Sequence, residues 1–224
     1  MLVLNRLSGE GAREYVLRVL KKNIIECALK PGQMLSENAL TEELNVSRTP
    51  VREALVELSK IDLIEVLPKR GSRVTKINYA LVEESNFARK VLEKAIVEIC
   101  CDLEKPQDFF RLEENLKLQK RFLYMSNQSR LLELDDEFHQ LLFQMAKKSH
   151  VYDYLEDIRI PFDRIRYLSL LVIFDLQTVN DHIEILNAIR QRNKKEALAV
   201  MDKHLSRYLY DKTVIMERYP DYII

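Results

Sequence analysis

Four side chains with metal-binding chemistry lie in the second half of the 224-residue chain. Asp135 and His139 are four residues apart, so on a helix both project from one face. His182 and His204 each lie within an apolar stripe at helical spacing, which would turn them inward from two further helices. Imidazole and carboxylate ligands suit a divalent transition metal such as Zn²⁺, Ni²⁺, Fe²⁺ or Mn²⁺. The pattern therefore indicates a metal site inside a helical bundle.

Two other interpretations of these residues stay open. A single histidine on an apolar helix face usually hydrogen-bonds to a neighbour, so all three histidines can be purely structural. The metal can instead be catalytic, which would require a general base near the metal-bound water. No further Glu or His lies at a suitable spacing for that role, and Asp136 is the candidate that remains.

A second group of residues has the chemistry to read DNA. Arg48, Thr49 and Arg52 lie near the start of a predicted helix and face away from its apolar stripe. Arginine bonds guanine bidentately, and a recognition helix presents its first turns to base edges. Taken singly, either arginine can instead be a solvated surface charge with no role in DNA binding. The apolar stripe of the same helix consists of Val51, Ala54, Leu55 and Leu58.

Local signals predict the elements that hold these side chains. Ser36 is a good N-cap for a first short helix, and Asn45 ends it because Asn tolerates the left-handed conformation. Ser47 then caps the second helix, and Pro50 falls in its first turn, where a missing N–H costs little. The order of helix, tight turn and helix is that of a helix-turn-helix.

A basic β-hairpin is expected directly after the second helix. Residues 63–67 and 72–77 are short runs rich in β-branched residues, and they predict two strands. Gly71 permits a positive φ at the tip, and Arg70 beside it can reach a phosphate or the minor groove. With this hairpin as the wing, the sequence predicts a winged helix-turn-helix.

The composition is that of a folded globular protein, with 47% hydrophobic and 31% charged residues. No apolar run approaches the ~20 residues that a membrane span needs, and the N-terminus lacks a signal-peptide pattern. Cys27, Cys100 and Cys101 show no CxxC spacing, so we expect reduced thiols in a cytoplasmic protein. Residues 1–78 carry 13 basic and 10 acidic side chains, whereas the remainder carries 22 and 25. The basic excess therefore lies in the part expected to touch phosphates.

The second part of the chain predicts an all-α antiparallel bundle. The last glycine is Gly71, and few prolines follow it, so little interrupts helix formation. Helices are expected over 80–104, 107–125, 129–147, 150–173 with a bend at Pro161, 178–192 and 194–217. The fold class is then mainly α, with a winged DNA-binding domain over 1–77 and a helical effector, metal and dimerisation domain over 78–224.

Residues 31–74, with SRTPVREAL at their centre, resemble the DNA-binding domain of GntR-family bacterial transcription regulators, and the resemblance covers roughly residues 12–77. The resemblance implies that Arg48, Thr49 and Arg52 contact operator bases and that Arg70 and Gly71 enter the minor groove. Ser47 starts the recognition helix and is included with these residues in the expected DNA-binding site. Some family members carry a further base-reading arginine where this sequence has Asn38, so its operator is expected to differ from theirs.

Residues 80–215 resemble the FCD ligand-binding domain found in the FadR-type branch of the same family. In its metal-binding members an Asp and a His four apart precede two further histidines, and Asp135 with the three histidines named above matches those positions. His150 falls outside the pattern. The resemblance implies a small organic acid bound beside or directly on the metal.

An anionic effector favours a cationic partner near the metal, and three arginines are candidates. Arg89 begins an amphipathic helix, while Arg164 and Arg166 follow Pro161. Arginine suits bidentate carboxylate recognition. Surface exposure or an ion pair, such as Arg89 with Glu93 at i,i+4, is the alternative for each.

These inferences combine into one expectation. The protein is a homodimeric, ligand-responsive regulator whose two winged domains bind a pseudo-palindromic double-stranded operator. A small carboxylate at the metal would change how the domains bind DNA, provided that its affinity differs between the two arrangements. Repression released by the effector is the expected mode, and a metal-dependent enzyme tethered to DNA and a regulator with a metal-free bundle are the alternatives.

Overall fold

The computed structural model describes residues 1–103, 109–173 and 176–224, and its contacts divide the chain into two units. The first contains Met1–Tyr79 together with Arg218–Ile224, and the second contains Ala80–Glu217. The division therefore falls close to the boundary expected after residue 77. The tail of the chain, expected in the second domain, groups with the first unit instead.

The tail belongs to the first unit because its backbone pairs with the end of that unit's chain. Ile77 and Ile223 form a parallel β-bridge. The Ile77 amide donates to the Tyr222 carbonyl at 2.8 Å, and the Ile224 amide donates to the Ile77 carbonyl at 3.0 Å. No periodic pattern in the sequence announces this short pairing.

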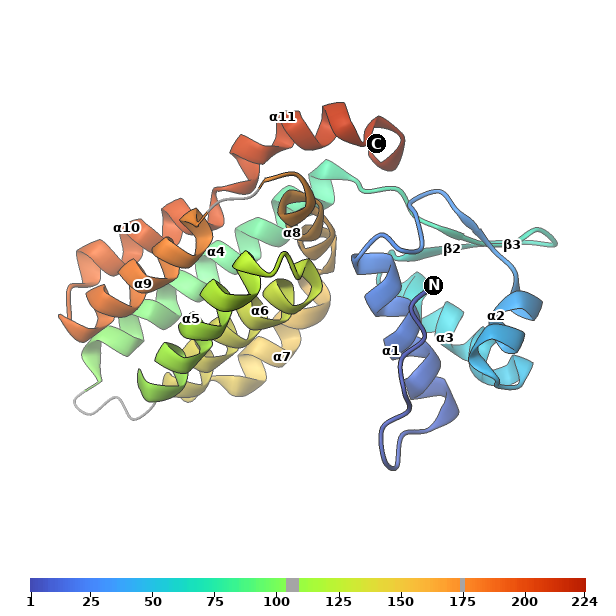
Figure 1. Cartoon of the computed structure of the whole chain (residues 1–224), viewed down its shortest axis with the longest axis horizontal. Helices are drawn as coiled ribbons and strands as arrows, with labels where there is room; N and C mark the ends of the chain where they lie inside the picture. Colours follow the sequence, from blue (N-terminus) through green and yellow to red (C-terminus); the bar gives the residue numbers. More distant parts are fainter. Residues whose placement is uncertain (104–108, 174–175) are drawn as a thin grey trace. The chain divides into compact units, whose positions relative to one another are not determined.

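The first unit is a winged helix-turn-helix (Figure 1), as predicted. Its three strands form an antiparallel sheet in the order β1-β3-β2. The two-residue strand β1 was not predicted, since two residues carry no alternation. The elements are α1 (Ala12–Ile25), β1 (Met34–Leu35), α2 (Glu37–Leu44), α3 (Arg48–Lys60), β2 (Ile64–Leu67) and β3 (Gly71–Val74).

Helix α2 begins and ends at the predicted capping residues, and α3 begins at the predicted position. The Ser36 hydroxyl accepts from the Ala39 amide at 3.4 Å, and Asn45 ends α2 with a φ of 51°. Ser47 occupies the N-cap position of α3, but among the described residues its side chain accepts no capping hydrogen bond. Pro50 lies in the first turn of α3 and is buried.

The wing requires a glycine for two reasons. Gly71 has a φ of 97°, which L side chains rarely adopt. A Cβ there would also lie 3.2 Å from the Leu35 carbonyl oxygen of β1. The hairpin strands span Ile64–Leu67 and Gly71–Val74, against the expected 63–67 and 72–77.

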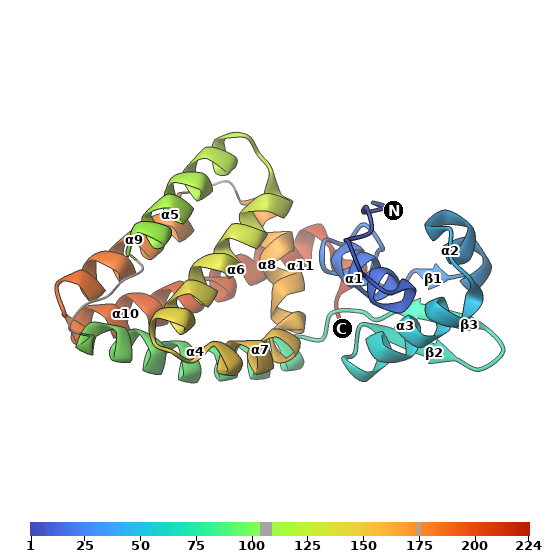
Figure 2. The ribbon, with the colours of Figure 1, turned by 90° about the horizontal axis from the view of Figure 1, so that it is seen from below.

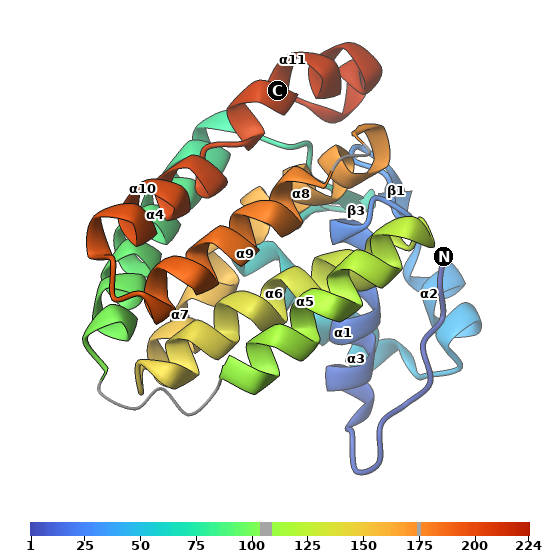
Figure 3. The same cartoon turned by 60° about the vertical axis from the view of Figure 1, so that its left-hand side comes forward.

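The second unit is the predicted helical bundle. Figure 3 shows α5, α6, α9 and α10 running alongside one another with α4 beside α10, and Figure 2 shows the same helices from below. Ion pairs join α4 to α10 near both ends of α10, including Lys94 with Asp202 at 3.1 Å and Asp102 with Lys194 at 2.7 Å. The helices are α4 (Tyr79–Asp102), α5 (Phe109–Tyr124), α6 (Gln128–Met145), α7 (Ser149–Ile158), α8 (Ile160–Val172), α9 (Gln177–Arg190), α10 (Lys194–Leu205) and α11 (Tyr208–Arg218), followed by a 3₁₀ turn at Pro220–Tyr222.

Two of the expected long helices are each divided. The segment 150–173 breaks at Arg159, since Pro161 starts a new helix more readily than it continues one. The segment 194–217 breaks at Ser206, whose hydroxyl donates to the Asp202 carbonyl at 2.6 Å and competes with the helical pattern. Expected helix ends at residues 104 and 107 lie outside the described residues.

No helix within the described parts of the chain is long and apolar enough to cross a membrane.

Candidate metal centre and DNA-reading helix

The bundle interior brings together the four predicted metal ligands. Asp135 and His139 lie on α6, His182 on α9 and His204 on α10. The Nε2 atom of His204 lies 3.2 Å from that of His139 and 3.4 Å from that of His182. The Asp135 carboxylate lies 3.6 Å from the His139 Nε2 and 3.4 Å from the His182 Nε2. All four ligand atoms are within 4.8 Å of one another.

This spacing fits a metal ion. A metal–nitrogen bond of ~2.1 Å places neighbouring ligand atoms about 3.0–3.4 Å apart in octahedral or tetrahedral geometry. The measured separations of 3.2–3.6 Å lie close to that range. Three buried nitrogen lone pairs directed at one point repel one another unless a cation lies between them. The donor set therefore fits a divalent transition metal.

An acceptor oxygen lies against Nδ1 of His139 and of His182. The paired atoms are His139 Nδ1 with Glu93 Oε2 and His182 Nδ1 with Gln119 Oε1 at 2.9 Å, whereas the Asp181 Oδ2 that faces His204 Nδ1 lies 3.9 Å away, beyond hydrogen-bond distance. An acceptor at Nδ1 favours the proton there and leaves the Nε2 lone pair of His139 and His182 for a metal. None of these three residues was predicted as part of the site.

The acceptor at His182 has a fixed orientation. The Gln119 Nε2 donates to the Asn115 Oδ1 at 2.6 Å, so the opposite side of the amide presents its oxygen to the ring. His182 must then donate through Nδ1. Phe138 stacks on the His182 ring with centroids 4.1 Å apart, which holds the ring in its plane.

Electrostatics keep the ligands in the forms that bind metal. Burial lowers the pKa of His182 to about 3, and burial likewise holds the pKa of His204 well below its usual value. Burial alone would raise the pKa of Asp135, but Arg166 and the nearby histidines outweigh it and hold that pKa well below normal. At neutral pH these two imidazoles are neutral and the carboxylate is ionised.

Arg166, a predicted effector ligand, is engaged in a buried ion-pair network. It contacts Asp135 and lies 2.8 Å from Asp136 and 2.6 Å from Asp163. Arg159 bonds the same Asp136 and lies 3.1 Å from Asp163. Burial by itself would raise the pKa of Asp136. The two guanidiniums outweigh the effect of burial and lower this pKa to about 2. Asp136 therefore holds arginines in place, which is not the environment of a general base.

A cavity of about 110 Å³ opens beside the ligands, with Asp135 and His204 in its wall. Arg89 and Arg166, two of the three arginines predicted as effector contacts, also line it. Arg89 is committed to Glu93 at 2.7 Å and lies over the Phe162 ring, 5.0 Å from its centroid.

Arg164 differs from the other two predicted effector ligands. It is buried, and it is not among the described residues that line the cavity. Because Arg164 and Arg166 both follow Pro161 on the same predicted helix, the sequence could not show which of them lines the cavity.

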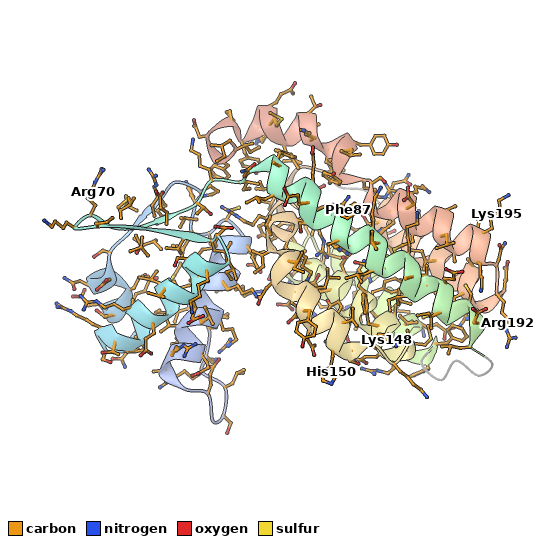
Figure 4. The ribbon with its side chains drawn as sticks, turned by 180° about the vertical axis from the view of Figure 1, so that it is seen from behind. Arg70, Phe87, Lys148, His150, Arg192 and Lys195 are labelled. Atoms are coloured by element: carbon orange, nitrogen blue, oxygen red, sulfur yellow. The ribbon has the colours of Figure 1, made fainter. Side chains whose placement is uncertain are left out.

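The DNA-reading side chains predicted on α3 are exposed. Arg48, Thr49 and Arg52 lie in its first turns and face solvent. Arg52 lies 2.7 Å from Glu37 of α2, and its side chain is 64% exposed. Figure 4 shows Arg70 at the tip of the hairpin, beside the exposed Gly71. The whole predicted set, Ser47 included, is therefore accessible to a duplex.

Comparisons with known proteins agree with both units. Residues 12–74 match the model of the bacterial regulatory proteins of the gntR family, and residues 84–207 match the FCD domain. The HTH-type transcriptional repressor RspR of Escherichia coli is 33% identical, over 88% of this chain and 86% of the relative. The chain belongs to the GntR family of bacterial regulatory proteins.

This GntR-family protein also resembles a transcriptional regulator of Streptomyces ambofaciens, with 30% identity over 91% of the chain and 86% of the relative. Among solved structures, Escherichia coli McbR/YncC has the same fold, with a TM-score of 0.78, 21% identity and coverage of 94% and 99%. The domains and relatives identify a transcription regulator, so the alternative of a metal-dependent enzyme is set aside.

Proposed function

We propose that this regulator is a cytoplasmic homodimeric repressor of the FadR-type branch, which releases its operator when a small organic acid binds at a divalent metal. The observation that carries the proposal is the convergence of three Nε2 atoms and the Asp135 carboxylate, with an acceptor oxygen at the Nδ1 of His139 and of His182. Asp135, His139, His182 and His204 would hold Zn²⁺, Ni²⁺, Fe²⁺ or Mn²⁺. The metal would supply a Lewis-acidic contact for a carboxylate.

The mode of regulation is drawn from the relatives. RspR is named a transcriptional repressor, and its similarity to this chain extends over 88% of the chain. An effector can release DNA only if it binds the DNA-incompetent arrangement more tightly. We therefore propose that the acid has higher affinity for the free regulator than for the operator complex.

A thermal-shift measurement tests the metal and the acid together. A ligand that binds only the native state raises the melting temperature by mass action. Added metal should raise the melting temperature of chelator-treated protein, and an organic acid should raise it further only when metal is present. Identical melting curves with and without metal would favour a bundle whose histidines are purely structural.

Arg52→Ala should weaken operator binding and relax discrimination at one base position. A bidentate arginine–guanine contact is worth about 1–3 kcal/mol, so the cognate affinity should fall about 5- to 150-fold. Titration of fluorescent operator and single-base variants, at one fixed salt concentration, measures both effects. Arg130→Ala is the matched control, because Arg130 is an exposed arginine paired with Glu133 at 2.8 Å in the other unit. Equal losses in the two variants would count against base reading.

The proposed dimer would use an exposed apolar strip on α4. Phe87 and Val91 lie four residues apart with 70% and 54% of their surfaces exposed, and Figure 4 shows Phe87 on the outer side of the helix. Large exposed apolar side chains in one strip mark association surfaces. Phe87→Glu should shift the protein from dimer to monomer in analytical ultracentrifugation. Phe110→Glu, at an exposed aromatic residue of α5 that is followed one turn later by Glu113 and Glu114, should leave the dimer intact.

A further inference from the structure

Arg52, the arginine proposed to read a base, is held by a carboxylate from the other helix of the helix-turn-helix. Its Nε donates to Glu37 Oε2 at 2.7 Å, and among the described residues its guanidinium makes no other hydrogen bond. A guanidinium carries its N–H donors in a planar fork. The donors on the two terminal nitrogens therefore remain available, and these nitrogens suffice for a bidentate contact with guanine.

The carboxylate that holds Arg52 projects from a rigid element. Glu37 lies in the first turn of α2, directly after the N-cap Ser36, where the helix dipole favours a negative charge. Buried Leu40 and Leu44 anchor α2 in the unit, and α3 is anchored by its own buried apolar stripe. Because the two partners come from two anchored helices, the ion pair restricts the directions in which the Arg52 side chain can point.

Folding stability does not account for this ion pair. The side chains of Arg52 and Glu37 are 64% and 32% exposed, and ion pairs this exposed contribute little to folding. A carboxylate on a DNA-binding surface also repels phosphates. Ordering a long side chain on binding costs free energy, and a side chain that is ordered beforehand avoids much of that cost. The pair therefore fits a role in recognition, in which one base contact gains at the expense of general affinity for DNA.

We propose that Glu37 is a positioning residue for base recognition. It holds the Arg52 guanidinium with its terminal nitrogens available, and it thereby raises discrimination at the base pair that Arg52 contacts. This inference rests on the proposed function, because it takes Arg52 to read a base of the operator. Glu37 acts through Arg52 and needs no contact of its own with the DNA.

The test uses the single-base operator variant at which Arg52→Ala loses discrimination. Glu37→Ala should lower the ratio of the affinity for the operator to that for this variant by about 2- to 10-fold, the cost of ordering one long side chain. Glu37→Gln keeps an acceptor for the Arg52 Nε without the charge, so its ratio should lie between those of the wild type and Glu37→Ala. Fluorescence titration at one fixed salt concentration measures each affinity.

Glu42→Ala is the matched control. It removes the same charge from the same helix, and Glu42 is exposed and has no ion pair within the described parts of the chain. A general effect of charge changes the affinities for the operator and for its variant alike, so Glu42→Ala should keep the wild-type ratio. Thermal unfolding midpoints close to that of the wild type establish that the variants are folded.

A double-mutant cycle shows whether Glu37 acts through Arg52. In the Arg52→Ala background, Glu37→Ala should cause no further loss of discrimination, because the guanidinium that it holds is absent. Equal losses in the two backgrounds would mean that Glu37 acts on the base pair independently of Arg52, and they would overturn the inference.

The outcomes distinguish this inference from the function on which it rests. If Arg52→Ala narrows discrimination and Glu37→Ala does not, or if Glu42→Ala narrows it as much as Glu37→Ala, the positioning role is overturned and base reading by Arg52 stands. Wild-type discrimination in Arg52→Ala would remove base reading by this arginine, and the inference with it.

Discussion

His139→Ala is expected to abolish stoichiometric metal binding. The substitution removes one of the four converging ligands and leaves only two imidazoles and one carboxylate around the ion. Since loss of an outer-shell partner alone costs about 10–100-fold in metal affinity, loss of a ligand should cost at least about 100-fold. Elemental analysis after desalting, against the wild-type protein loaded with one equivalent of zinc, measures the effect.

Two further variants make this experiment decisive. His150→Ala removes a histidine whose side chain is 98% exposed and which Figure 4 shows on the surface of the bundle, so it should retain full metal. Glu93→Gln weakens the acceptor behind His139 and should reduce metal affinity by about 10–100-fold. Metal retained in His139→Ala, or absent from the wild-type protein, would refute the proposed centre.

Arg166→Met should lower the free energy of unfolding by about 3–5 kcal/mol, because it leaves the buried Asp135 carboxylate without its arginine and Asp136 and Asp163 with Arg159 alone. Arg166 contacts Asp135 and lies within 2.8 Å of both Asp136 and Asp163, and its side chain is 12% exposed. Denaturant unfolding in the presence of a chelator measures the loss, since a bound metal would itself neutralise Asp135.

Arg190→Met supplies the comparison for the buried network. Arg190 contacts Glu113 in an ion pair whose two side chains are 38% and 40% exposed. Exposed pairs contribute about 0–1 kcal/mol, so this variant should unfold almost as the wild-type protein does. A loss for Arg166→Met no larger than that for Arg190→Met would show that the network does not stabilise the bundle.

Local sequence signals predicted the first unit well because its elements depend on near neighbours. Ser36 and Asn45 set the ends of α2 through contacts within a few residues, and Gly71 marks the hairpin. Strand β1 escaped prediction because it is two residues long and pairs with β3 far along the chain. Pro161 predicted a bend close to the break at Arg159, whereas no proline or glycine marks the break at Ser206.

The four candidate metal ligands could be identified from the sequence because each is an unusual residue on an apolar face. The acceptors behind them were not, because Glu93 and Gln119 reach His139 and His182 from other helices. The same limit applies to the arginines. The sequence left Arg166 as either an effector contact or an ion-pair partner, whereas the fold surrounds it with carboxylates from α6 as well as from its own helix.

The pairing of the chain's last residues with Ile77 has a genetic consequence. A nonsense codon at Arg218 would spare every helix that carries a metal ligand, yet it would delete part of the unit that reads DNA. The Ile77 amide and carbonyl would both lose their partners. Alleles truncated at the 3′ end of the gene should therefore resemble mutants that fail to bind the operator more than mutants that bind the operator but no longer respond to the effector.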